Sequence, residues 1–263
     1  MMKKIFARQN FLFLVLILAL LGMFSVAFAG YAPTDLEIKE NFILKERPFS
    51  KKEAARIRTA LLEKSTTQEP EIVMNENGWL YYESGDSTME DFEMEEEAAV
   101  EFAKNELKDL GLLPDGDYRL EVDVITSYEK TVVFFHTYNG LEIFSDMETQ
   151  EGEGEGEGIG IRINKNGLST LLYCWRDIVP VSGSNTGSEA SIIDEVEATE
   201  LYKKEVVKEH PEAADVVDDW FVFVSPAYRY AEGKSIKIWV FSQDEKYYLN
   251  TVFIDMHTGE VVE

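Results

Sequence analysis

Apolar residues recur at helical spacing in three parts of the chain. Ser50-Lys51-Lys52-Glu53 has the S-x-x-E pattern of a helix N-terminus, and apolar residues follow it at spacings of three and four. A second apolar stripe runs from Ala98 to Leu110 and stops at Gly111, a residue typical of helix ends. A third lies within residues 188–209, where Ser188 or Ser191 is the expected N-cap, and it ends before Pro211. Each pattern predicts an amphipathic helix.

Runs of alternating apolar residues between turn residues predict antiparallel strands. Asn77-Gly78 separates two such runs and is a strong hairpin signal. After the second helix, two runs meet at Asn139-Gly140, and a further hairpin turns at residues 164–167. Three more runs follow the third helix. A helix followed by antiparallel strands therefore occurs twice in the second and third parts of the chain.

This order predicts an α+β fold of tandem units, each an amphipathic helix packed on an antiparallel sheet. We expect an N-terminal helix and hairpin region at residues 30–90, a first unit at 91–180 and a second unit at 188–263. The first unit contains Glu-Gly four times in succession over residues 151–158. Glycine disfavours order and the glutamates repel one another, so an exposed acidic loop is expected there.

The first 29 residues predict export. Three basic residues and no acid precede an uncharged apolar run at residues 11–28, which ends in Ala27-Phe28-Ala29. This pattern is typical of a cleaved signal peptide. The run is also long enough to span a bilayer, so an uncleaved membrane anchor is an alternative, and a buried core helix is a third. Under the first two interpretations residues 30–263 are extracytoplasmic, either secreted or anchored to the outer face of the cytoplasmic membrane.

Composition and charge exclude several classes of protein. The chain has 45% hydrophobic and 29% charged residues, as a globular protein does. Its 25 Lys and Arg against 50 Asp and Glu give a formal net charge of -25. This charge argues against nucleic acid and anionic lipid as partners, because both require a basic surface. The single cysteine, Cys174, excludes an internal disulfide and a cysteine-rich zinc site.

Residues with catalytic or metal-binding chemistry form no recognisable motif. His136, His210 and His257 lack the spacing of a helical zinc site, and neither a nucleophile elbow nor a phosphate-binding loop is present. Cys174 lies in a strand pattern, which favours a buried, unreactive thiol. We therefore predict no catalytic residue, no metal ligand and no cofactor. Pairs of carboxylates, and weak calcium binding by the acidic loop, stay open because acidic residues are abundant.

Two segments resemble known modules. TVVFFHTYNGLEIF, at residues 131–144, resembles the strand–turn–strand of propeptide-type modules that precede thermolysin-like proteases, with Tyr138 and Gly140 at the turn. YYLNTVFIDMHTGEVV, at residues 247–262, resembles the closing hairpin of PepSY domains. Its matching turn residues are Asp255, Thr258 and Gly259, and Met256 stands where that family often has alanine.

The order of elements over residues 90–263 also resembles the YycH/YycI group of extracytoplasmic regulators of Firmicutes. This resemblance implies a non-enzymatic protein-binding module that regulates a sensor kinase or a protease, with such a protein or another envelope protein as its partner. Membrane attachment through residues 11–28 is implied as well. Two features depart from that group: the leader ends in a cleavable pattern, and the acidic Glu-Gly insertion is extra.

Two other functions fit the sequence. One is a cell-envelope hydrolase that uses a pair of carboxylates. The other is a secreted acidic protein with a structural or cation-binding role, suggested by the net charge of -25.

Overall fold

The structure, a computed structural model, describes residues 41–65, 69–85, 89–149, 152–155, 157–181, 192–214, 217, 222–242 and 251–262. All of them belong to one compact unit, residues 40–263. The predicted leader or anchor, residues 1–29, lies outside the described residues. No helix within the described ranges has the length and hydrophobicity that a membrane crossing requires.

Three α-helices lie within these ranges: α2 (Lys51–Lys64), α3 (Glu96–Leu110) and α4 (Glu195–Glu209). The predicted capping box begins α2, since the Ser50 and Glu53 side chains each accept a hydrogen bond from the other residue's backbone N–H. Gly111 ends α3 in the left-handed conformation. The N-cap of α4 is Asp194, whose carboxylate accepts the N–H of Glu197, and a short 3-10 helix (Pro211–Ala213) follows α4.

The remaining described elements are strands. In chain order they are β1 (Phe42–Lys45), β2 (Glu71–Met74), β3 (Leu80–Glu83), β4 (Tyr118–Thr126), β5 (Glu129–Tyr138), β6 (Leu141–Thr149), β7 (Gly152–Glu155), β8 (Gly158–Asn164), β9 (Gly167–Cys174), β10 (Asp177–Pro180), β11 (Phe223–Ala231), β12 (Lys234–Ser242), β13 (Val252–Asp255) and β14 (Val261–Val262).

The predicted α+β fold of tandem units is wrong. The described chain is mostly β, and one large mixed sheet has the strand order β14-β13-β12-β11-β6-β5-β8-β9-β3-β2, with β4 beside β5 and β7 beside β6. Two long-range pairings produce this sheet: β3 pairs antiparallel with β9, and β6 pairs parallel with β11. Apolar periodicity defines local elements but does not specify their partners, so the sequence did not reveal these pairings. The predicted domain boundaries stay predictions.

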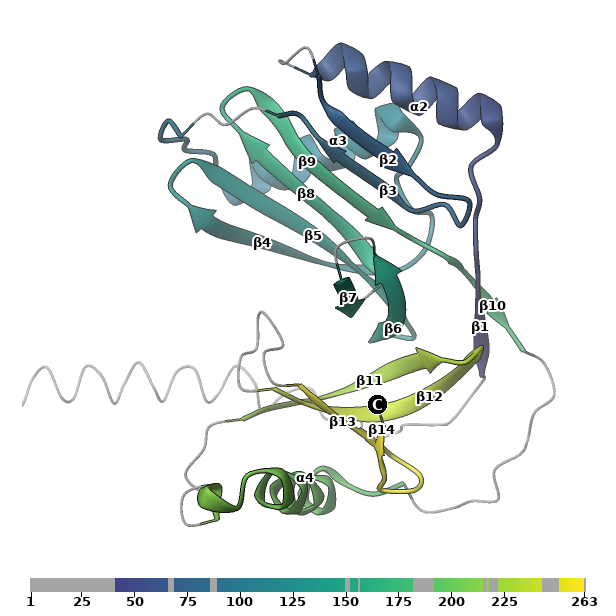
Figure 1. Cartoon of the computed structure of the whole chain (residues 1–263), viewed down its shortest axis with the longest axis vertical. Helices are drawn as coiled ribbons and strands as arrows, with labels where there is room; N and C mark the ends of the chain where they lie inside the picture. The colour runs from purple at the N-terminus through teal and green to yellow at the C-terminus, as the bar shows by residue number, and fades with distance from the viewer. Residues whose placement is uncertain are drawn as a thin grey trace, which may run out of the picture. The chain divides into compact units, whose positions relative to one another are not determined.

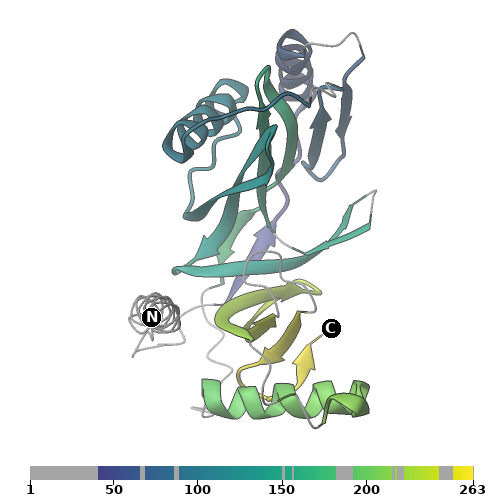
Figure 2. The same cartoon turned by 90° about the vertical axis from the view of Figure 1, so that its left-hand side faces the viewer.

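Two hydrophobic clusters cover the helix-facing parts of the sheet. The larger contains Ile57 and Leu61 of α2 and the predicted stripe of α3 except the exposed Ala98, packed on strands that include β3, β5, β8 and β9. In Figure 1 α3 lies behind these strands. The smaller cluster joins Tyr202 of α4 to Phe241 of β12, whose rings stack at a centroid distance of 4.8 Å. Figure 2 shows α4 beside the strands β11–β14.

Strands β1 and β10 form a separate two-stranded ribbon (Figure 1). Phe42 and Leu44 of β1 are buried against Ile143 of β6 and Tyr228 and Tyr230 of β11. The backbone N–H of Phe42 also donates to the Ser235 hydroxyl of β12, at 3.0 Å. The ribbon therefore joins the N-terminal residues of the described chain to its C-terminal strands.

The predicted acidic loop at residues 151–158 is not a loop over its described length. Residues 152–155 form β7, which pairs with β6, and Gly158 begins β8. Glu157, the last glutamate of the repeat, is only 2% exposed. Backbone pairing offsets the ordering entropy of the glycines, and buried contacts hold Glu157 in place.

Candidate functional site

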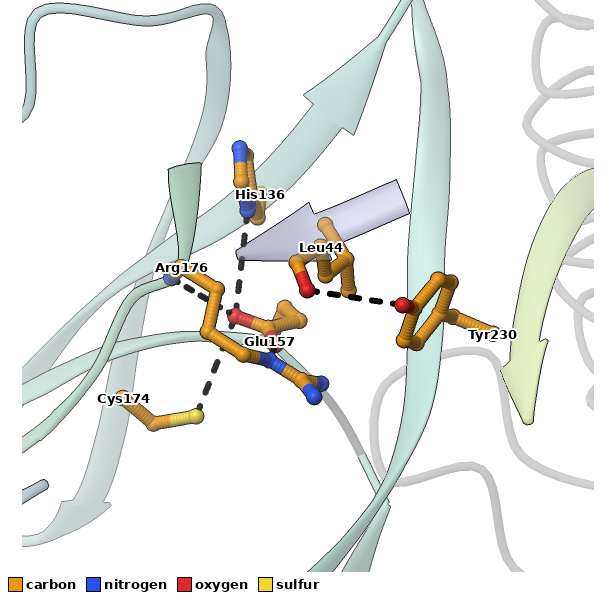
Figure 3. Close-up of polar contacts among 6 residues, drawn as sticks. All are labelled: Leu44, His136, Glu157, Cys174, Arg176 and Tyr230. Atoms are coloured by element: carbon orange, nitrogen blue, oxygen red, sulfur yellow. Dashed lines mark hydrogen bonds and ion pairs between the residues drawn. The ribbon is translucent and has the colours of Figure 1, made fainter. Parts of the chain in front are cut away.

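A buried polar cluster surrounds Glu157 where the strands β5, β8 and β9 meet the ribbon. His136 is near the end of β5, Cys174 ends β9, and Arg176 lies between β9 and β10. Figure 3 shows these three side chains arranged around the Glu157 carboxylate. Because ionisable groups are rarely buried without partners, this cluster is the main candidate site within the described residues.

Arg176 makes the strongest contacts with Glu157. Its Nε donates to Glu157 Oε1, and its backbone N–H donates to Oε2 at 3.3 Å. The side-chain contact is an ion pair in which Glu157 is fully buried and Arg176 is mostly buried. The two charges therefore compensate each other where contact with water is limited.

His136 and Cys174 complete the cluster. The Cys174 thiol donates to Glu157 Oε2 at a sulfur–oxygen distance of 3.9 Å. His136 Nδ1 lies 3.8 Å from the same oxygen and has no hydrogen-bond partner among the described residues. Its ring stacks on Trp175 at a centroid distance of 3.9 Å. The backbone N–H of His136 donates to the Glu157 carbonyl, so strand pairing fixes the relative positions of His136 and Glu157.

The cluster also contacts β11 and β1. The Arg176 guanidinium lies over the Tyr230 ring, with Cζ 5.3 Å from the ring centroid. The Tyr230 hydroxyl donates to the backbone carbonyl of Leu44 at 3.4 Å (Figure 3). The Glu157–Arg176 ion pair thus holds a guanidinium against an aromatic residue from a strand about fifty residues later.

Burial determines what this arrangement can do chemically. A thiol, an imidazole and a carboxylate are groups used in nucleophilic catalysis. Here Cys174 is 6% exposed and His136 is 2% exposed, so neither presents its reactive atom to a dissolved substrate. Three-residue groups of His, Cys, Asp and Glu with metal-binding geometry are absent from the described part of the chain. The contacts observed are those of a structural ion-pair cluster.

Burial also changes the pKa of a tyrosine beside the cluster and of a lysine on β12. Tyr173, next to Cys174 on β9, loses hydration of its ionised form, which raises its pKa to about 12; Asp177 and Glu157 act in the same direction and Arg47 opposes them. Burial lowers the pKa of Lys237 on β12, whose ammonium lies 5.8 Å from the centroid of the Tyr228 ring. Both shifts disfavour charge inside the protein.

The sequence did not identify Glu157, because it lies in a repeat that appears uniformly acidic. One signal was present: Glu157 is in phase with Ile159, Ile161 and Ile163, which alternate along β8 and are all buried. A residue two positions before such a run belongs on the same face of the strand. Arg176 carried no comparable signal.

The predicted turn at Tyr138 and Gly140 joins β5 to β6. Asn139 and Gly140 both have positive φ, 52° and 77°, as a two-residue hairpin turn requires. The Tyr138 ring packs against Phe42, with 4.8 Å between ring centroids, and belongs to the cluster under the ribbon. Its described contacts are those of a core residue.

The predicted turn at Asp255, Thr258 and Gly259 joins β13 to β14. The Asp255 carboxylate accepts the backbone N–H groups of His257 at 2.6 Å and of Thr258 at 3.0 Å. Gly259 has φ of 70°, and a Cβ there would approach Leu201 of α4 to 3.0 Å. This turn packs on α4, whereas the Tyr138 turn packs on the ribbon, so the two predicted motifs do not form one site.

Neither a protein-family model nor a curated protein matches this chain. Among solved structures, the C-terminal domain of Bacillus megaterium YpeB is similar, with 10% sequence identity and a TM-score of 0.40. The alignment covers 82% of this chain and 97% of that domain. A likeness at this level carries no argument about function.

Proposed function

We propose that this chain is a non-enzymatic extracytoplasmic module that binds another protein and regulates a sensor kinase or a protease. The two turn segments that resemble propeptide-type and PepSY modules, and the N-terminal pattern typical of exported proteins, support this proposal. The net charge of -25 favours a protein partner over nucleic acid or anionic lipid.

The observation that carries the proposal is the burial of the Glu157 cluster. Within the described residues, this is where a thiol, an imidazole and a carboxylate come together, and all three are at most 6% exposed. A catalytic group must come within hydrogen-bond reach of its substrate. The buried thiol, imidazole and carboxylate contact one another inside the protein. They therefore stabilise the fold, and with it the surface that a partner would recognise.

Cross-linking on intact cells tests this function. The full chain, tagged at its C-terminus, is expressed in the organism that encodes it and treated with a membrane-impermeant cross-linker. We expect a sensor kinase or a protease to be recovered, and the activity of that protein to change when the gene is deleted. Recovery of neither class would contradict the proposal.

A turnover assay tests the alternative function, that of a hydrolase. The purified protein is incubated with peptidoglycan fragments and with unstructured peptides, and products are followed by mass spectrometry. We expect no product above the level of a Cys174→Ala variant. Turnover by the wild-type protein that this variant loses would show that the buried cluster is catalytic.

A further inference from the structure

Strand β4 is an open edge of the sheet in the described structure. It pairs with β5 over Tyr118–Asp123, and no other described strand pairs with it. Figure 1 shows β4 at one side of the sheet, with β5 as its neighbour. An unpaired edge presents rows of backbone donors and acceptors that can pair with another chain.

The hydrogen-bond pattern identifies the backbone groups on this edge. The N–H of Thr137 donates to the carbonyl of Asp117 at 3.2 Å, so positions 117 and 137 form a hydrogen-bonded pair. Bonded and non-bonded pairs alternate along antiparallel strands. Arg119, Glu121 and Asp123 therefore bond to β5, and the backbone N–H and carbonyl groups that point outward belong to Tyr118, Leu120 and Val122.

The side chains of these three residues also lack full cover. Tyr118, Leu120 and Val122 pack against the main hydrophobic cluster but are only partly buried. A strand added beside β4 would bury them further, because its own side chains would continue the same face of the sheet. Apolar side chains at alternate positions of the added strand suit this face.

The opposite face of the edge is acidic. Asp115 and Asp117 are exposed and Glu121 is partly exposed. Arg119 is held by ion pairs with Glu121 and Glu142, at 2.9 and 3.0 Å, and its guanidinium lies over the Phe135 ring. The local excess of negative charge favours basic residues at the other alternate positions of an added strand.

The other ends of the sheet are less available. Along the main strand order the sheet ends at β2 and β14. On β2 the carbonyl of Ile72 accepts a hydrogen bond from the Arg58 side chain of α2, at 3.3 Å. On the other side β14 has two residues. Among these edges β4 is the longest regular one.

We infer that the edge of β4 at Tyr118, Leu120 and Val122 binds an extended segment of a partner protein, with alternating apolar and basic residues, as an added antiparallel or parallel strand. This inference rests on the proposed function and specifies its binding surface. Backbone hydrogen bonds provide affinity in such strand addition, and the alternating side chains provide specificity.

Hydrogen exchange of the free, full chain gives the first test. The backbone amides of Tyr118, Leu120 and Val122 should exchange fast, and those of Arg119, Glu121 and Asp123 slowly. Similar protection at all six positions would overturn the inference, because the edge would then be covered already.

Peptide binding gives the second test. The probe is a seven-residue peptide of alternating valine and lysine with blocked ends, and its affinity is measured by fluorescence anisotropy. We expect protection of the amides of Tyr118, Leu120 and Val122 on binding. Methylating one of the peptide's backbone nitrogens on the bonding edge should weaken binding about tenfold, since one bond contributes about 1–1.5 kcal/mol. Equal binding by the methylated peptide would show non-specific charge attraction and overturn the inference.

Matched variants test the protein side. Leu120→Pro removes an outward N–H without removing a bond to β5, whereas Leu120→Ala keeps the N–H and loses similar packing. Binding should fall about tenfold in L120P and less than about threefold in L120A. Equal losses in the two variants would overturn the inference. A wild-type dimer that L120P dissociates would also overturn it, because the occupant would be a second copy.

The inference and the proposed function can fail separately. If L120P is cross-linked on cells to the same kinase or protease as the wild-type protein, the β4 edge is not the binding surface and the proposed function stands. If neither protein is cross-linked to such a partner, the proposed function fails.

Discussion

At the scale of single residues, Glu157 shows how a buried charge can organise several strands. Its carboxylate accepts hydrogen bonds from Arg176 and Cys174, and its backbone pairs with His136. Removing one partner of a buried ion pair leaves the other without compensation and is strongly destabilising. The stability of the protein should therefore depend on this carboxylate more than on surface acids.

Glu157→Gln should lower the free energy of unfolding by about 3–5 kcal/mol, because it leaves the Arg176 guanidinium buried without an opposite charge. Urea denaturation followed by circular dichroism measures this loss. Glu205→Gln, which breaks an ion pair with the exposed Lys208, is the control and should leave the unfolding midpoint unchanged. Equal midpoints for both variants would contradict the structural role of the cluster.

Gly78 and Gly140 form a second matched pair. Both have positive φ. A Cβ at Gly78 would lie 2.2 Å from the Arg47 carbonyl oxygen, whereas a Cβ at Gly140 would have no other atom within 4 Å. Gly140→Ala should cost about 1–2 kcal/mol of backbone strain. Gly78→Ala should cost at least about 2 kcal/mol more, because the chain must also move. Thermal unfolding of both variants measures the difference, and equal losses would contradict this geometry.

At the scale of elements, the sequence predicted the pieces that local patterns specify. The capping box of α2, the Gly111 end of α3 and the Asn77-Gly78 hairpin are all confirmed. The β1–β10 ribbon was not predicted, because its strands are short and more than a hundred residues apart. The N-terminus of α4 was also missed: Asp194 caps it, whereas the pattern favoured Ser188 or Ser191, which lie outside the described residues.

The ribbon gives a prediction at this scale. Phe42 is 1% exposed and contacts the rings of Tyr138 and Tyr228, whereas its neighbour Ile43 lies on the exposed face. Phe42→Ala should lower the free energy of unfolding by about 3–5 kcal/mol. Ile43→Ala, the control, should lower it by about 0.5 kcal/mol or less. Denaturant titration measures both, and similar values would mean that the ribbon does not pack as described.

At the scale of the whole molecule, the mixed sheet shows where sequence patterns stop being informative. The Asp255 turn and the Tyr138 turn each join two strands, but the parallel pairing of β6 with β11 and the antiparallel pairing of β3 with β9 were not foreseen. Both bring together strands that other elements separate in the chain. Local propensity carries no information about such partners. Because these two pairings were missed, the predicted fold class was wrong.

Buried tyrosines predict that the protein loses stability as the pH rises above 10. Burial raises the pKa of Tyr173 to about 12 and raises the pKa of Tyr82 and Tyr228 in the same direction. Between pH 10 and 12 the unfolded chain binds fewer protons than the folded protein, so stability present below pH 10 is lost as pH rises.

For Tyr173 alone the loss is roughly 2–3 kcal/mol. Urea denaturation at pH 9, 10, 11 and 12 should show a decreasing free energy of unfolding, and Tyr173→Phe should show a smaller decrease. An unchanged slope in this variant would mean that other groups control the alkaline transition.

The pairing of early strands with late ones has a consequence for synthesis on the ribosome. Strand β3 can find its neighbour only after residues 167–174 emerge, and β1 must wait for residues 177–180. Until then Leu80 and Tyr82, both completely buried in the finished protein, stay accessible to chaperones and proteases. Nascent chains that end before β9 should therefore be degraded, and the released protein should fold slowly for its size.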